Sequence, residues 1–173
     1  MDRDPISINI LFDECIGQRV AESLVNVLQL DTRFSLNAEY LKRWIAEGAS
    51  DQEWVPRARD ERRFVITADS GRQRKGPPLQ LLLPYHGVSG AFFTGGVHNK
   101  PQVEKARAIL SLWSHIVDAA IEDTVGRYRM GIHTKAKNGL VSTFAWKEWP
   151  LSKKEQERLR DEQGSFRETF DFK

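Results

Sequence analysis

The chain has 173 residues, which is enough for one domain with a full hydrophobic core and a C-terminal extension. Its formal net charge is only +2, so the chain as a whole is not a polycation that would bind nucleic acid through bulk charge. The sequence holds no apolar run of membrane-spanning length and no charged-then-apolar leader, so we expect a soluble, cytoplasmic protein with no membrane partner.

The first half of the chain alternates predicted strands and helices. The apolar run at residues 6–12 predicts a buried strand, and apolar residues at helical spacing predict a helix over residues 16–28. The next expected elements are a short extended piece at 33–36, a helical turn over 39–46 that Gly48 ends, a helix from Ser50 or Asp51 to about Arg62, and a strand at 64–67.

The alternation continues in the second half. Pro77 and Pro78 are expected to open a short leucine-rich helix, residues 91–94 form another strand, and Pro101 starts a long helix through Asp123. This order predicts an α/β layered fold with a central, mainly parallel sheet flanked by helices.

After Gly126 the pattern changes to a hairpin. Asn138-Gly139 is a tight-turn signal between residues 129–137 and residues 140–146. Basic residues alternate with Met130, Ile132 and Thr134, which predicts a hairpin with one basic face. The residues of that face are Arg129, His133, Lys135 and Lys137.

The last part of the chain is polar. Residues 147–173 carry seven basic and seven acidic side chains, so we expect a charged tail that is helical or disordered. Phe166 and Phe170 are one helical turn apart and would dock either on a partner or on the body of the protein. We therefore divide the chain into a domain over residues 1–146 and a tail over residues 147–173.

Four acids stand at predicted strand ends or helix starts. Asp13 and Glu14 follow the first strand, Asp51 opens a helix, and Asp69 follows the strand at 64–67. Strand ends are where α/β sheets build their sites, although each acid taken singly is also a preferred helix cap. Oxygen ligands without a nearby Cys or His suit Mg²⁺ or Mn²⁺ rather than zinc. The sequence therefore predicts one metal site that these acids share.

Three short motifs in this order resemble the PIN-like domains. They are Asp13-Glu14 after the first strand, the Asp-x-Glu-Trp-Val-Pro segment over 51–56, and the Thr-Ala-Asp over 67–69 that ends a hydrophobic strand. The resemblance spans roughly residues 6–123 and is nearest to the VapC-type toxin branch. It implies a PIN-like fold, a divalent-metal site and endoribonuclease activity, often as the toxin half of a toxin–antitoxin pair.

By this resemblance Asp13, Asp51 and Asp69 are the metal-binding and catalytic acids. PIN nucleases carry a further acid between the first and third of these positions. Here the candidates are Glu14, Glu39 and Glu47, and we assign Glu14 because it lies beside Asp13. The substrate would be RNA, and an antitoxin or a second copy of the chain would be a protein partner.

Basic residues near these acids are candidates for holding RNA. Arg72, Arg74 and Lys75 follow Asp69 closely and would clamp phosphates. Arg129, Lys135 and Lys137 on the hairpin would add phosphate contacts further away. The hydroxyls of Thr67 and Ser70 would bind water or phosphate, or would simply close the turn. A further basic group over residues 57–63 is either a solvated face or a nucleic-acid contact.

Two other functions remain open on the sequence. A phospho-receiver domain also places paired acids after its first strand, but Thr94 and Lys100-Pro101 are too close together for the helix that a receiver needs between them. A degenerate PIN-like module that binds RNA or protein without cleaving is the stronger alternative. Cys15 is expected to be a small buried residue, and the four histidines lack the spacing of metal ligands.

Overall fold

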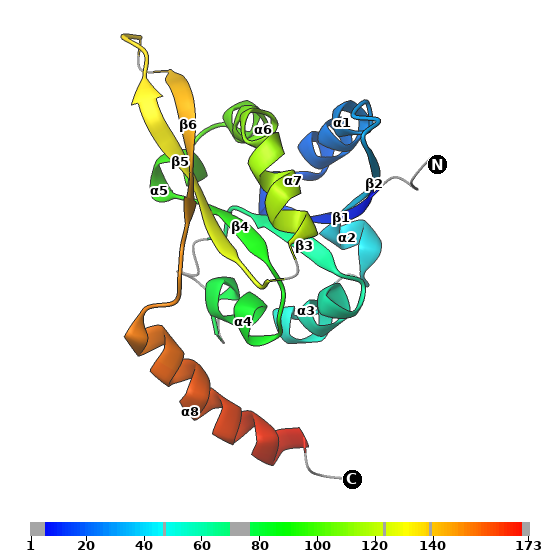
Figure 1. Ribbon diagram of the computed structural model, residues 1–173, viewed down its shortest axis with the longest axis vertical. Coiled ribbons are helices and arrows are strands. Elements are labelled where there is room, and N and C mark those ends of the chain that lie inside the picture. Colours follow the sequence, from blue (N-terminus) through cyan, green and yellow to red (C-terminus); the bar gives the residue numbers. More distant parts are fainter. Residues whose placement is uncertain (1–5, 47, 70–76, 123, 139, 171–173) are drawn as a thin grey trace.

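A six-stranded sheet forms the centre of the computed structural model, which describes residues 6–46, 48–69, 77–122, 124–138 and 140–170 (Figure 1). The strand order is β2-β1-β3-β4-β5-β6. Strands β1 to β5 run parallel to their neighbours, and β6 is antiparallel to β5. The predicted α/β fold with a mainly parallel, helix-flanked sheet is confirmed.

The elements alternate along the chain as follows. The strands are β1 (Ile6–Phe12), β2 (Phe34–Tyr40), β3 (Arg63–Thr67), β4 (Gly90–Phe93), β5 (Arg127–Lys135) and β6 (Val141–Glu148). The helices are the short 3-10 helix η1 (Glu14–Ile16), α1 (Gln18–Leu28), α2 (Leu41–Trp44), α3 (Asp51–Asp60), α4 (Leu79–Tyr85), α5 (Gly95–His98), α6 (Gln102–Ser111), α7 (Trp113–Ile121) and α8 (Lys153–Phe170).

Helices cover both faces of the sheet. On one face α1, α6 and α7 pack their apolar sides on β1, β3 and β5, and on the other face α2, α3 and α4 pack on the alternate residues of β1, β3 and β4 (Figure 1). All five residues of β3 are therefore buried. A strand that is covered on both faces needs a continuous apolar run, and Phe64, Val65 and Ile66 supply it. Among the described residues, no helix is both long and apolar enough to cross a lipid bilayer.

Three predicted helices differ from the observed ones. The helix expected over 16–28 begins as η1 and restarts at Gln18, because Gly17 has a positive φ of 81° that ends the first turn. The turn expected from Glu39 begins only at Leu41, because residues 34–40 pair with β1 along its whole length. The long helix expected after Pro101 is split into α6 and α7 at Leu112, where φ is −105° and ψ is 11°.

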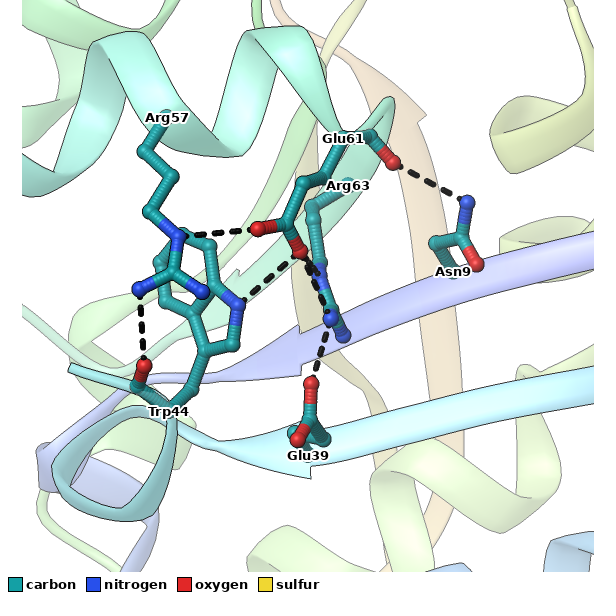
Figure 2. Close-up of polar contacts among 6 residues, drawn as sticks. All are labelled: Asn9, Glu39, Trp44, Arg57, Glu61 and Arg63. Carbon is teal, nitrogen blue, oxygen red and sulfur yellow. Dashed lines mark hydrogen bonds and ion pairs between the residues drawn. The ribbon is translucent and has the colours of Figure 1, made fainter.

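A buried arginine joins the strands and helices on the α2 and α3 side of the sheet. Arg63 opens β3, and only 4% of its side chain is exposed. Its guanidinium donates two hydrogen bonds of 3.0 and 2.9 Å to the Glu61 carboxylate and a third to the Glu39 carboxylate (Figure 2). Glu39 therefore serves as an ion-pair partner inside β2, and it is not free to act as the fourth acid of the predicted metal site.

Glu61 is the centre of this network. Its carboxylate also accepts hydrogen bonds from the indole N–H of Trp44 at 2.9 Å and from Arg57 Nε at 2.8 Å (Figure 2). Arg57 in turn donates to the Trp44 carbonyl oxygen at 3.0 Å and lies over the indole ring. The basic group at 57–63 is thus partly a structural assembly, since Arg57 and Arg63 both bind Glu61.

A second buried arginine attaches α8 to the sheet. Only 3% of the Arg127 side chain is exposed, and it donates to the carbonyl oxygens of Gln80, Trp149 and Pro150. It also makes a two-pronged ion pair with Glu155 in the first turn of α8, with distances of 3.0 and 3.1 Å. The charged segment after residue 147 therefore begins as the end of β6 and continues as an ordered helix that extends away from the sheet (Figure 1).

The ion pair makes the attachment of α8 sensitive to acid. The hydrogen bonds from Arg127, with a smaller contribution from Ser152, lower the pKa of Glu155 to about 2. A lowered carboxyl pKa stabilises the folded state above the ordinary value of 4.5, and this stabilisation is lost as the pH falls towards 2. We expect the protection factors for amide hydrogen exchange in residues 153–161, which compare the observed rate with the intrinsic rate at the same pH, to fall over this pH range. In Glu155→Gln the exchange should already be fast at pH 7, whereas Glu157→Gln, which leaves Arg127 paired, should behave like the wild type.

Candidate active site

Asp13 is a buried carboxylate at the end of β1. It is 1% exposed, and its backbone N–H continues the pairing with β3 by donating to the Ile66 carbonyl at 3.0 Å. One carboxylate oxygen accepts the Glu14 N–H at 2.8 Å, so Asp13 caps η1. The other accepts the Thr67 hydroxyl at 2.6 Å. These bonds fix the carboxylate at the carboxyl ends of β1 and β3.

Thr67 connects the first and third predicted acids. It ends β3 and is fully buried. Its hydroxyl donates to Asp13 and accepts the backbone N–H of Asp69 at 2.9 Å. Of the two roles considered for Thr67, the structure gives it the turn-forming one. Asp69 is half-buried, and its Oδ2 atom is shielded from solvent.

Asp13 and Asp69 lie where the strand order reverses. From β1 the chain first moves to β2 on one side and then crosses to β3 on the other side, so β1 and β3 are neighbours at a switch point. Open α/β sheets bind their ligands outside the carboxyl ends of the strands at such a point. These two acids therefore occupy the position in the fold that most often holds a binding or catalytic site.

Asp51 reaches the same edge from a helix. It is the first residue of α3, which leads directly into β3 and packs back along it. Ten helical residues span about 15 Å, close to the roughly 16 Å of a five-residue strand, so the start of α3 returns to the carboxyl edge of the sheet. The Asp51 carboxylate accepts the indole N–H of Trp54 at 3.0 Å, and Trp54 is itself a core residue.

Glu14 lies at the surface of this edge. Its side chain is 42% exposed and forms an ion pair of 3.2 Å with Lys42 of α2. Tyr40 is buried nearby, and this burial raises the pKa of its hydroxyl. The charge of Lys42 lowers that pKa, whereas the charges of Glu14 and Asp13 raise it further. Glu14 is thus beside Asp13 in sequence but turns towards solvent and Lys42. Glu47, the remaining candidate for the further acid, lies outside the described residues.

His98 belongs to this region, and the sequence analysis assigned it no role there. It ends α5, and its ring Nδ1 lies against the carbonyl oxygen of Ala68, one residue before Asp69. A carbonyl oxygen only accepts, so this ring nitrogen carries the proton. His98 therefore holds the backbone of the Thr-Ala-Asp turn. No sequence spacing links positions 68 and 98, and only the fold brings them together.

Oxygen atoms are the donors that this edge offers to a cation. Mg²⁺ is commonly held by one or two carboxylates, with water and substrate phosphate completing its shell. Asp13 and Asp69, coupled through Thr67, fit that requirement. Within the described part of the chain, no three His, Cys, Asp or Glu side chains are close enough to hold a metal ion together. The two acids at the switch point are therefore the donors we consider first, and Asp51 stands on a separate element, at the start of α3.

The predicted RNA-binding residues fall into two groups. Arg72, Arg74 and Lys75 lie outside the described residues, as does Ser70. On the hairpin, Arg129 is exposed and stacks its guanidinium on the Trp149 ring at 3.8 Å, and Lys135 and Lys137 are exposed near the tip. The predicted strict alternation is interrupted, because the β5–β6 pairing shifts between Ile132 and Lys135 and β5 ends before Lys137.

Sequence comparison agrees with this geometry. The fold is a mainly parallel α/β sheet with acids at its switch point. Proteins of this α/β class place their site at the carboxyl edge of the sheet. Residues 8–94, half of the chain, match the family model described as a PIN like domain. The chain belongs to the PIN-like domain family, which favours this interpretation over a receiver domain. No curated protein and no solved structure matches the chain.

Proposed function

We propose that the protein is a divalent-metal-dependent endoribonuclease that cleaves RNA phosphodiesters. The observation that carries the proposal is the buried Asp13 carboxylate, which Thr67 couples to Asp69 at the switch point of a PIN-like sheet. PIN-like domains are commonly nucleases, and a pair of acids at this edge is the chemistry that such a reaction needs.

Mg²⁺ or Mn²⁺ bound here would supply a water of lowered pKa and would neutralise the charge that develops on the phosphate oxygens. We propose Asp13 and Asp69 as its ligands, with Asp51 contributing directly or through water. Glu14 would act through water from its exposed position. Arg72, Arg74 and Lys75 would hold the flanking phosphates of the RNA.

The role of the described residues is to hold these acids in place. Hydrogen bonds from the Glu14 N–H and the Thr67 hydroxyl orient the Asp13 carboxylate, and the Thr67 hydroxyl holds the backbone of Asp69 in the turn. His98 restrains the same turn through Ala68. Catalysis by positioning requires this rigidity, because small displacements of reacting groups cost rate.

We further propose that the protein is the toxin of a toxin–antitoxin pair, on the strength of its resemblance to the VapC-type branch. Induced expression should then arrest growth of a bacterial host, and co-expression of the product of an adjacent small gene that encodes a DNA-binding protein should restore growth. Arrest by the wild type but not by a cleavage-deficient variant would tie toxicity to RNA cleavage.

The nuclease proposal is tested directly by incubating the purified chain with end-labelled single-stranded and structured RNAs. We expect endonucleolytic products in Mg²⁺ or Mn²⁺, none in EDTA, and recovery of cleavage when the metal is restored. Absence of cleavage of every RNA in both metals would reject the proposal.

One observation supports the alternative of a binding module without catalysis. The described residues hold no group of three His, Cys, Asp or Glu side chains that could bind a metal ion, and Glu14, our candidate for the further acid of PIN nucleases, is 42% exposed. A binding module would shift RNA in a mobility assay in EDTA and in Mg²⁺ alike, with intact RNA recovered from the complex. The cleavage assay above separates the two functions.

The hairpin is expected to contribute to RNA affinity rather than to chemistry. Replacing Lys135 and Lys137 with alanine should weaken binding of single-stranded RNA and lower the slope of log K against log salt by about 0.7 for each lost phosphate contact. The cleavage rate at saturating RNA should change little. Fluorescence anisotropy at several salt concentrations measures the slope.

The matched control replaces Lys153 and Lys154, which are exposed at the start of α8 and carry the same charge. This variant should keep the wild-type slope. Equal slopes for the two double variants would show that the hairpin lysines serve another purpose, such as docking an acidic segment of an antitoxin.

A further inference from the structure

A cavity of about 490 Å³ lies at the edge of the sheet opposite the acids. It is lined by the beginnings of β1 and β3, by the segments just before β4 and β5, and by the ends of α3 and α7, whereas Asp13 and Asp69 follow the ends of β1 and β3. A cavity of this size accommodates a small organic ligand. Because the length of the strands separates the two edges, this cavity is a site of its own and not an extension of the candidate active site.

One side of the cavity carries guanidinium groups. Arg59, Arg62 and Arg63 line it, together with the hydroxyl-bearing residues Ser7, Ser89 and Thr124. Arg59 forms an ion pair with Asp60, and Arg63 binds Glu61 and Glu39. Arg63 is of particular interest, because its Nη1 atom is buried and has no hydrogen-bond partner among the described residues, while Nε and Nη2 bind Glu61 and Glu39. A buried guanidinium nitrogen without a partner is costly, which makes the Arg63 side of the lining the less stable part of this wall.

Arg62 is held at this cavity by an unusual backbone. Its φ of 50° makes it the one non-glycine residue with a positive φ among the residues that the structure describes. Such a conformation is strained for a long side chain, and strain of this kind concentrates at ligand clamps. The left-handed turn reverses the chain between α3 and β3, and it leaves the Arg62 side chain exposed at the cavity.

The other side of the cavity is apolar. Ile6, Ile121 and Val125 line it and are 54, 41 and 50% exposed, and the apolar wall continues with Phe64 and Val88. Exposed large apolar side chains that border a cavity suggest a ligand surface. The acid in the described lining, Glu122, accepts a hydrogen bond of 3.3 Å from the Tyr128 hydroxyl.

We propose that this cavity binds a small phosphate monoester with an apolar or aromatic group, of the size of a nucleoside monophosphate. The phosphate contacts the exposed Arg62, because a guanidinium group binds phosphate with two parallel hydrogen bonds. The apolar group covers the exposed isoleucine and valine side chains. The proposal is independent of RNA cleavage, since none of the acids at the opposite edge lines this cavity.

Isothermal titration with AMP, GMP, CMP and UMP in EDTA tests the proposal, with adenosine and inorganic phosphate as the separated halves of the ligand. At least one nucleotide should bind more tightly than either half. Arg62→Asn should weaken that binding about tenfold, as expected for the loss of one charge-assisted contact. Asn accepts a positive φ, so the melting temperature without ligand should not fall.

Two controls locate the binding. Arg19→Gln removes an equal charge from an exposed position on α1, and Asp69→Asn alters the opposite edge; both should keep the wild-type affinity. No nucleotide binding at millimolar concentration would overturn the proposal. So would equal affinity in Arg62→Asn and the wild type, phosphate binding as tightly as the nucleotide, or loss of binding in Asp69→Asn.

Discussion

Replacing Asp69 with asparagine is expected to abolish Mg²⁺- or Mn²⁺-dependent cleavage of RNA. The change removes a charge and leaves the volume nearly the same, and the backbone N–H that binds Thr67 is untouched. A fall in rate of about a thousandfold corresponds to about 4 kcal/mol of lost transition-state stabilisation. Single-turnover cleavage of an end-labelled RNA measures this loss separately from any change in RNA binding.

The control is Asp118→Asn on the exposed side of α7, which removes the same charge far from the switch point. It should cleave at the wild-type rate. Asp69→Asn should also melt within about 4 °C of the wild type in EDTA, which is the shift expected for about 1 kcal/mol in a domain of this size. Undiminished cleavage by Asp69→Asn would remove Asp69 from the mechanism.

Much of the fold was accessible from the sequence because its signals are local. The apolar runs that became β1 and β3 and the helical spacing within α1 are properties of short segments. The errors arose where tertiary pairing decided the outcome. β2 extends to Tyr40 because β1 offers it seven partners, and the break at Leu112 lets α6 and α7 follow the sheet separately. The local spacing of apolar residues predicts neither the length of β2 nor the break at Leu112.

The candidate site was predictable only in part. The positions of Asp13 and Asp69 after neighbouring strands followed from the rule that parallel strands share a carboxyl edge. Their coupling did not, since a hydroxyl that bonds two acids 56 residues apart in sequence is visible only once β1 and β3 are paired. Glu39 shows the converse, because it was a candidate acid by sequence but binds the Arg63 guanidinium in the fold.

The cavity at the amino edge was not predicted at all. Its lining comes from the beginnings of two strands, the segments before two others and the ends of two helices, and no short motif marks such a set. The basic group at 57–63 was the one available signal. The sequence alone did not show that these arginines have different roles. Arg57 and Arg63 bind Glu61, and Arg59, Arg62 and Arg63 line the cavity.

Replacing Arg63 with methionine is expected to cause a large loss of stability. The change leaves Glu39 and Glu61 facing each other without their shared cation, and Trp44 loses the guanidinium above its ring (Figure 2). Breaking a buried ion pair costs about 3 to 5 kcal/mol, and we expect the lower value because both carboxylates are partly exposed. At about 2 to 4 °C for each kcal/mol, thermal unfolding should report a fall of about 6 to 12 °C at pH 7.

The pH dependence gives this prediction a second measurement. Burial tends to raise the pKa of Glu61, but the hydrogen bonds from Arg63, Arg57 and Trp44 outweigh it and keep the pKa below the ordinary 4.5. Glu61 therefore stabilises the wild type above that value, and the contribution disappears as the pH falls below it. The difference in melting temperature between the wild type and Arg63→Met should narrow on acidification.

Arg33→Met is the matched control, because Arg33 is 70% exposed and pairs with Asp31 at the surface, where an ion pair contributes less than about 1 kcal/mol. Equal losses in the two variants would show that the network around Glu61 does not stabilise the fold.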